Sequence, residues 1–351
     1  MREDFAESLA AFHDLAQEKA NARRAYDLHI IHEELNRIEE RFARAEQVPP
    51  EVEQEVFAYQ EQKQALMRHM HEQLQSLDAG GTLETEQGAW SVLQQEEGKF
   101  IAVRGDRHIE ITRGQLMTDP EWGIAYDVND PSIHRNTKKR YVIERMKQQL
   151  QDLLDAQIFT VESKRGTTHL KLHKAYERAQ EDRDSTQMQM GIIAERMVRT
   201  FLEQLAWDYP DLGFVVERAD VQQDVESKID FIIHRRSHAR GVNVEAIEGP
   251  KDAGIQFTTR QDAEGLAHKQ EQIARAKLFA KGIDDLVLVK IPMENFVDAY
   301  TAWRGKQTPG GPERYWNQQT KDEIFRNVMA GLFTTEEVER ELTILHQKPA
   351  A

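Results

Sequence analysis

The chain has 351 residues, which is long enough for two or three domains and at least one large hydrophobic core. Its 39% hydrophobic and 30% charged residues are typical of a globular protein rich in surface helix, and its net charge of −15 argues against a general polyanion binder. The absence of cysteine excludes disulfides and thiolate metal sites and fits a cytoplasmic location. No apolar run reaches about 18 residues, so we expect no membrane span and no membrane partner.

Residues 1–78 are predicted to form two long helices. Apolar residues recur three or four positions apart on both sides of Val48–Pro50, and the two prolines end the first helix because proline lacks a backbone donor. Two such helices joined at a proline turn form an antiparallel hairpin or coiled-coil arm. Nothing in this arm carries catalytic chemistry, so we expect it to act as a scaffold, to form a homodimer or to contact a protein partner.

Residues 84–178 are predicted to form a small α+β region. Three short β-type runs are separated by glycine turns and predict a small antiparallel sheet: Trp90–Leu93, Phe100–Val103 and His108–Thr112. A loop is expected around 119–131, and apolar residues at helical spacing predict a helix over 136–157. After that helix, Ile158–Glu162 is expected to be extended, to turn at Lys164–Thr167 and to return as His169–His173.

The end of this region is basic and resembles the helix-and-wing arrangement of winged DNA-binding domains. From His134 to Arg178 the chain has 11 Lys or Arg residues against 5 Asp or Glu, a net charge of +6. One basic segment in an acidic chain indicates a confined contact with an anion, although a solvated charged face explains it as well. If the contact is nucleic acid, with DNA favoured over RNA, the expected contact residues are Lys138, Lys139, Arg140, Lys164 and Arg165.

Residues 189–292 carry the pattern of an α/β unit in the order helix, three strands, helix, strand. The expected elements are Gly191–Leu205, Gly213–Glu217, Lys228–His234, Gly254–Thr259, Ala263–Ala280 and Asp285–Ile291. The strands are short and apolar, as strands covered on both faces are. Residues 293–351 then close the chain with helices at Glu294–Trp303, Thr320–Met329 and Thr335–Leu345, and Thr334–Glu337 has N-cap chemistry.

Four polar residues of this unit stand where a buried core would not favour them: Glu195, Asp230, Gln256 and Lys269. Each alone has a structural explanation, such as a surface charge, a strand-end acid or a hydrogen-bonding filler. If the strands form one sheet with both helices packed on it, however, the four side chains could converge. Carboxylate and amide oxygens suit Mg²⁺ (or Mn²⁺), and a nearby ammonium could offset developing negative charge.

The ordered elements, with Glu195, Lys228-Ile-Asp230 and Ile255-Gln-Phe-Thr258, resemble the PD-(D/E)xK nuclease superfamily over residues 189–291. The resemblance implies a three-layer αβββαβ core in which Asp230 and Gln256 hold the metal and Glu195 is the helix glutamate. The position of the motif lysine is Thr258. Some members carry that lysine on the following helix, where Lys269 is the match, and Lys228 is a rival on the strand.

The function implied by this resemblance is a Mg²⁺-dependent endonuclease that hydrolyses phosphodiester bonds of nucleic acid. Two alternatives stay open. The unit could be an inactive nuclease fold that binds nucleic acid or protein without cleaving, or a structural coiled-coil protein could carry an unrelated α/β domain. His234 and His238 share a four-residue spacing near a strand end, and we expect both to be surface residues.

Overall fold

A computed structural model of the chain describes most of its residues in sixteen segments. These are 36–37, 39–40, 50–78, 88–96, 99–104, 106–122, 125–126, 135–164, 190–220, 223–224, 227–236, 252–258, 263–277, 283–290, 293–306 and 308–347. The predicted turn and return strand after Lys164, the residue His238 and most of the first N-terminal helix lie outside these segments. Of that first helix, residues 36–37 and 39–40 are helical, as predicted.

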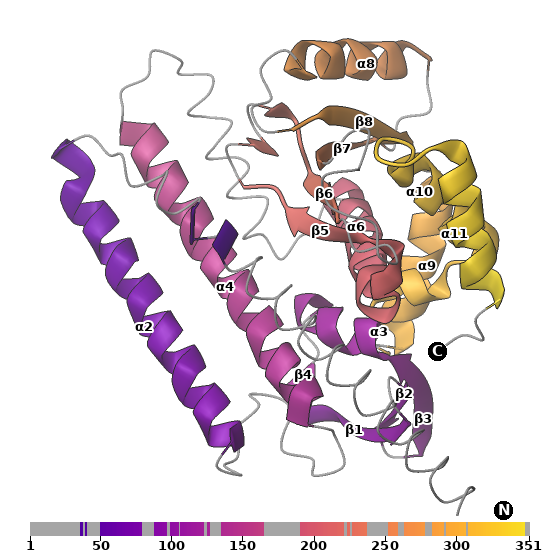
Figure 1. Cartoon of the computed structure of the whole chain (residues 1–351), viewed down its shortest axis with the longest axis horizontal. Helices are drawn as coiled ribbons and strands as arrows, with labels where there is room; N and C mark the ends of the chain where they lie inside the picture. Colours follow the sequence, from indigo (N-terminus) through magenta and orange to yellow (C-terminus); the bar gives the residue numbers. More distant parts are fainter. Residues whose placement is uncertain are drawn as a thin grey trace, which may run out of the picture.

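The second N-terminal helix is confirmed as α2 (Glu53–Asp78), which follows the 3-10 turn η1 (Pro50–Val52). It packs along α4 (Arg135–Lys164), and the two long helices lie side by side at one edge of the molecule (Figure 1). The Thr160 hydroxyl donates to Tyr59 Oη at 3.4 Å near the start of α2, and Leu66 farther along α2 packs in one cluster with Leu150 of α4. The two helices are therefore antiparallel. Their contact joins the predicted N-terminal arm, residues 1–78, to the predicted α+β region, residues 84–178.

The expected strand at Ile158–Glu162 is wrong, because α4 continues through it to Lys164. Ile158 packs with Leu150 and Leu154 in one cluster, and Val161 is also buried, so the apolar side chains keep helical spacing to the end. The β-branched residues of this segment favour a strand intrinsically, but burial against α2 outweighs that weak preference.

The predicted small antiparallel sheet is confirmed. Its strands run in the order β3-β2-β1-β4, with β1 antiparallel to β2, β2 antiparallel to β3, and the short β4 parallel to β1. The strands are β1 (Gly88–Glu96), β2 (Lys99–Arg104), β3 (Arg107–Thr112) and β4 (Ala125–Tyr126). The short helix α3 (Arg113–Thr118) and the 3-10 turn η2 (Asp119–Trp122) follow β3, and the sequence pattern did not predict α3.

The predicted order of helix, three strands, helix and strand is confirmed over the second half of the chain. Its elements are α6 (Met190–Asp208), η3 (Pro210–Leu212), β5 (Phe214–Arg218), β6 (Phe231–Arg235), β7 (Asp252–Thr258), α8 (Ala263–Lys277) and β8 (Asp285–Lys290). The sheet order is β5-β6-β7-β8, antiparallel between the first three strands and parallel between β7 and β8. Parallel neighbours need a long crossover, and α8 provides it. The mixed α/β class is thus confirmed.

Helices cover both faces of this sheet. On one face Ile273 and Ala276 of α8 pack against Ile232 and Leu286. The backbone of Gly254 lies close to the Leu286 side chain on this face, so that an added Cβ would lie 2.5 Å from it. On the other face the larger core joins α6 to the sheet and to the C-terminal helices, which lie beside α6 in Figure 1. The C-terminal elements are α9 (Met293–Lys306), η5 (Pro312–Tyr315), α10 (Gln318–Met329) and α11 (Thr335–Gln347).

Several contacts tie the small sheet and the turns after it to this core, among them Gln204 Nε2 donating to Thr118 Oγ1 at 3.1 Å and the N–H of Gly310 donating to Asp119 Oδ1 at 3.1 Å. Helix α3 packs on α6 at Gly114, where an added Cβ would lie 2.4 Å from the carbonyl oxygen of Gln204. Glu121 of η2 forms an ion pair with Arg199 of α6 and accepts a hydrogen bond from Thr200. Burial would raise the pKa of Glu121, but Arg199 and Arg196 outweigh it and lower that pKa, so the carboxylate stays charged.

No helix in the described segments is both long and apolar enough to cross a membrane.

The expectation that His234 is a surface residue is wrong. It lies on β6 with 9% of its surface exposed, because β5 and β7 flank it. Its Nδ1 lies 2.6 Å from Asp252 Oδ1 and its Nε2 lies 2.9 Å from Glu217 Oε2. Burial would lower the pKa of His234, but the bonds to Asp252 and Glu217 outweigh it and raise that pKa.

Replacement of His234 by Gln is expected to destabilise the fold by about 1–3 kcal/mol near pH 6, and by much less near pH 9. Because the folded pKa is raised, the stabilisation is complete below the unfolded pKa of about 6.5 and is lost as the pH rises through the folded value. Urea unfolding of both proteins at the two pH values measures the difference. An equal loss of stability at both pH values would show that the charged imidazole ring does not stabilise the sheet.

Candidate functional site

Asp230 lies directly before β6, at the point where β6 meets β7. Its backbone N–H donates to the carbonyl of Ile255 at 2.8 Å, and its Oδ2 accepts from the backbone N–H of Phe257 at 2.5 Å. These two bonds hold the carboxylate against the middle of β7. Asp230 is therefore fixed in place by the backbone of the neighbouring strand.

Gln256 lies on β7 between those two contacts, next to Asp230. The antiparallel register pairs Phe231 with Ile255, so Asp230 and Gln256 are cross-strand neighbours with side chains on the same face. Gln256 is 3% exposed, and its Oε1 has no hydrogen-bond partner among the described residues. A buried carbonyl oxygen without a donor is unfavourable, so this oxygen is a candidate ligand for a cation.

Lys269 comes to the same face of the sheet from α8. Gly265, Lys269, Ile273 and Ala276 have helical spacing, and all four are buried or partly buried while their neighbours on the helix are mostly exposed. Lys269 therefore belongs to the stripe that packs on the sheet, as the sequence predicts. Its ammonium is close enough to Asp230 to lower the pKa of that carboxyl.

Two further carboxylates act on Asp230, Glu195 from α6 and Asp224 from the link between β5 and β6. Burial raises the pKa of Asp230 well above its ordinary value, and the charges of Glu195 and Asp224 raise it further. The N–H of Phe257 and Lys269 act in the opposite direction without cancelling the rise. Glu195 and Asp224 thus act on Asp230 beside its cross-strand neighbour Gln256, with Lys269 acting from α8, and we call this part of the sheet the acidic corner.

Asp224 was not predicted, because the polar link that carries it has no periodic pattern. The link begins with a reciprocal pair of bonds, in which Gln223 N donates to Asp220 Oδ1 at 2.7 Å and Asp220 N donates to Gln223 Oε1 at 2.9 Å. That is a capping box, and the helical turn that it starts holds Asp224. An Asp-x-x-Gln spacing just before the strand is the signal that could have located this turn.

Lys228 is not on a strand. The strand position that made it an alternative to Lys269 for the motif lysine is therefore wrong. Strand β6 begins at Phe231, whereas Lys228 is exposed and has a left-handed backbone with φ 57°. Its N–H donates to the carbonyl of Asp224 at 3.1 Å, so it ends the helical turn in the position where glycine is usual. Lys228 shapes the chain ahead of Asp230, and it is not among the groups that act on the pKa of Asp230.

Thr258, at the position of the motif lysine, is buried on the same face of β7 as Gln256. The described residues contain no group of three or more His, Asp or Glu side chains arranged to hold a metal. Glu195, Asp224 and Asp230 do not form such a group, so the candidate donors are the Asp230 carboxylate and the Gln256 oxygen. Mg²⁺ uses one or two carboxylates and keeps several waters, so this donor set fits it.

The basic residues proposed for nucleic-acid contact have different surroundings. Lys138 and Lys139 on α4 are partly buried, and Arg140 is buried with its guanidinium over the Trp207 ring at 5.4 Å from the centroid. Arg140 therefore packs inside and does not face an outside partner. Arg165 and the side chain of Lys164 lie outside the described residues.

A buried ion network along α6 was also missed by the sequence analysis. Arg199 pairs with Glu121 and, at 3.0 Å, with Glu203, and the charge of Glu195 acts on both Arg196 and Arg199. Burial raises the pKa of Glu203 to about 7, against the opposing charge of Arg199. The network links the acidic corner to the contact with the small sheet.

Comparison with known proteins found no family model that matches the chain, and no curated protein or solved structure that is similar to it. The functional assignment therefore depends on the residues described above and on their geometry.

Proposed function

We propose that this protein is a divalent-metal-dependent nuclease of the PD-(D/E)xK type that hydrolyses phosphodiester bonds. The observation that carries the proposal is the corner of the sheet where Glu195 and Asp224 act on Asp230 beside the unpartnered Oε1 of Gln256. The strand order and the crossover through α8 support it, since they agree with the αβββαβ order of that superfamily.

A cation accounts for this corner better than a purely structural role does. Burial and the charges of Glu195 and Asp224 disfavour the ionised form of Asp230, and the charge of Lys269 acts in the opposite direction. A buried amide oxygen without a donor adds a second unfavourable group. One Mg²⁺ or Mn²⁺ would offset both, with Asp230 and Gln256 as the ligands and Glu195 and Asp224 nearby.

Each residue then has a role in hydrolysis. When bound, a divalent cation would supply a more acidic water and charge stabilisation at the phosphate. The N–H of Phe257 fixes one oxygen of Asp230, so the other is left to face the ligand. Lys269 would stabilise the charge that develops on the phosphate, in place of the lysine that Thr258 replaces.

The proposed substrate is nucleic acid, with DNA favoured. Arg218 at the end of β5 pairs with Asp152 of α4 at 3.2 Å, so α4 runs beside the strand end that leads to Asp224. The exposed Arg135 and the partly buried Lys138 lie on the same helix, 17 and 14 residues before Asp152, which is about 25 and 21 Å along its axis. A second candidate, an inactive nuclease fold that binds without cleaving, is favoured by Thr258 at the motif lysine position.

Replacement of Asp230 by Asn should lower Mg²⁺-dependent cleavage by about 10²–10³-fold, because the amide keeps the shape but removes the charge. Cleavage of supercoiled plasmid DNA and of single-stranded RNA by the full chain, with Mg²⁺ or Mn²⁺, measures the activity. Asp298→Asn on the exposed side of α9 is the matched control and should cleave as the wild type does. Salt-dependent binding of nucleic acid without cleavage by the wild type would favour the inactive fold.

The two lysines can be separated by opposite substitutions. Lys269→Met should reduce cleavage by about 10²-fold or more, because the ammonium on α8 is lost while the apolar stem is kept. Lys228→Gly should keep the activity and raise the free energy of unfolding by about 0.5–1 kcal/mol, because glycine relieves the left-handed backbone. Cleavage rates and urea unfolding test both. Loss of activity in Lys228→Gly with full activity in Lys269→Met would reverse the assignment.

A further inference from the structure

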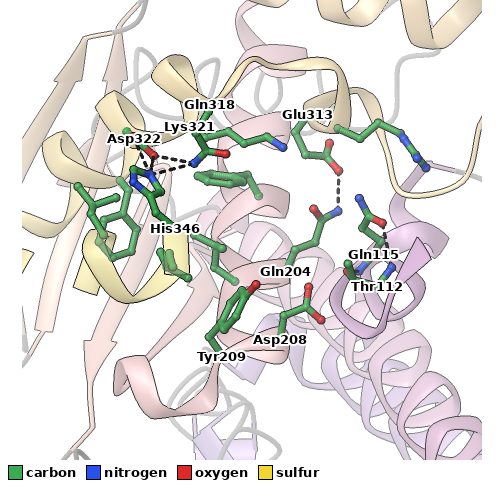
Figure 2. Close-up of a pocket in the computed structure, with 16 residues that line it drawn as sticks. Thr112, Gln115, Gln204, Asp208, Tyr209, Glu313, Gln318, Lys321, Asp322 and His346 are labelled. Atoms are coloured by element: carbon green, nitrogen blue, oxygen red, sulfur yellow. Dashed lines mark hydrogen bonds and ion pairs between the residues drawn. The ribbon is translucent and has the colours of Figure 1, made fainter. Parts of the chain in front are cut away.

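A second site is suggested by a half-open cleft of about 480 Å³ between α6, α10 and α11, with the junction of β3 and α3 at one end (Figure 2). The α6 residues that line this cleft run from Phe201 to Asp208, which lie 6 and 13 residues after Glu195, or about 9 and 20 Å along the helix axis. None of the residues of the acidic corner lines the cleft, and the volume of the cleft is in the range of small-molecule sites.

One wall of the cleft is apolar. The side chains that form it come from three helices and pack in or against the main hydrophobic core: Phe201, Leu205, Phe325, Leu342 and Leu345. Such a wall would cover the apolar body of a ligand, and burial of that body would supply binding energy.

The opposite side holds a lysine without a partner. Lys321 in the first turn of α10 is partly buried, and no described residue forms a hydrogen bond or an ion pair with its ammonium. Figure 2 shows its side chain extending across the cleft toward Glu313. Burial lowers the pKa of Lys321, although Glu313 partly opposes this. A partly buried ammonium that forms no ion pair is unfavourable.

Glu313 faces this lysine without forming an ion pair with it. The residue is 1% exposed, its Oε1 accepts from Gln204 Nε2 at 2.6 Å, and its Oε2 has no partner. Burial raises the pKa of Glu313 well above its ordinary value, which favours the neutral acid over the carboxylate. In its neutral form Glu313 would present an O–H, so that this group and the Lys321 ammonium would both be donors that face the same space.

The other acids of the cleft already have donors. Asp208 Oδ1 accepts from the N–H of Gly114 at 2.7 Å. Asp322 accepts from Gln318 at 2.8 Å and pairs with His346 at 3.0 Å. Burial raises the pKa of Asp208 to about 6, so at pH 7 this group is still mostly ionised. The group of the cleft that lacks a partner of opposite charge is thus the Lys321 ammonium, which favours an anion, and the N-terminus of α10 favours the same sign.

We propose that this cleft binds a small organic anion with an apolar body. An anionic oxygen of the ligand would lie between Lys321 Nζ and Glu313, and its apolar part would lie on the wall around Phe201 and Phe325. Because the ligand contacts α6, α10 and α11 at once, it would stabilise the contact between the core and the C-terminal helices. The proposal is independent of the nuclease assignment, since it uses none of the residues near Asp230.

Three probes with the same eight-carbon chain test the charge requirement: octanoate, octan-1-ol and octylammonium. Calorimetric titration of the full chain, together with the shift in thermal unfolding, measures binding. We expect saturable binding of octanoate with a stoichiometry of one, weaker binding of octan-1-ol and none of octylammonium. Lys321→Met should reduce the affinity for octanoate by about tenfold or more, or roughly 1.4 kcal/mol, and leave that for octan-1-ol unchanged.

The matched control is Lys290→Met, which removes an exposed lysine at the end of β8 and should bind octanoate as the wild type does. Thermal unfolding without ligand shows whether each variant is folded. If the Lys321→Met protein is unfolded, Lys321→Gln is measured instead and should show the same loss of affinity for octanoate. Octylammonium binding more tightly than octanoate, an unchanged octanoate affinity in the Lys321 variant, or no saturable binding of octanoate to the wild type would each overturn the proposal.

Discussion

Crowding of negative charge around Asp230 is the constraint on which the rest of the account depends. The carboxyl is held by the N–H of Phe257 on the neighbouring strand, so it cannot move away from Glu195 and Asp224. Burial raises the pKa of Asp230, the charges of Glu195 and Asp224 raise it further, and the same corner contains an amide oxygen of Gln256 that lacks a donor. Such a combination is unfavourable unless Asp230 takes up a proton or a cation offsets the negative charge.

Most of the core could be predicted from sequence because its elements have strong local patterns. The runs around Ile232 and Val287 are short, apolar and bounded by glycine or charged residues, which indicates strands covered on both faces. The helix–three strands–helix–strand order then places Asp230 beside Gln256 and brings Lys269 over them. Element order carried more of this prediction than any one residue, since each polar residue alone also fits a structural role.

The missed features depend on contacts between distant segments. Ile158 favours a strand locally, yet it is helical because the end of α4 packs along α2. Arg140 and His234 look like surface residues until Trp207 and Glu217, from other elements, cover them. Asp224 lies in a polar link whose one signal is a capping box. Hydrophobic periodicity does not report such partners, because they are set by tertiary packing.

Calorimetric titration of the full chain with Mn²⁺ tests the central claim most directly, because it measures the cation site without requiring cleavage. The account predicts one saturable site that Asp230→Asn abolishes and that Gln256→Leu weakens by about tenfold or more, equivalent to roughly 1.4 kcal/mol. Absence of saturable Mn²⁺ binding in the wild type, or the same affinity in all three proteins, would contradict it. In that case the acidic corner would be a structural feature of an α/β fold.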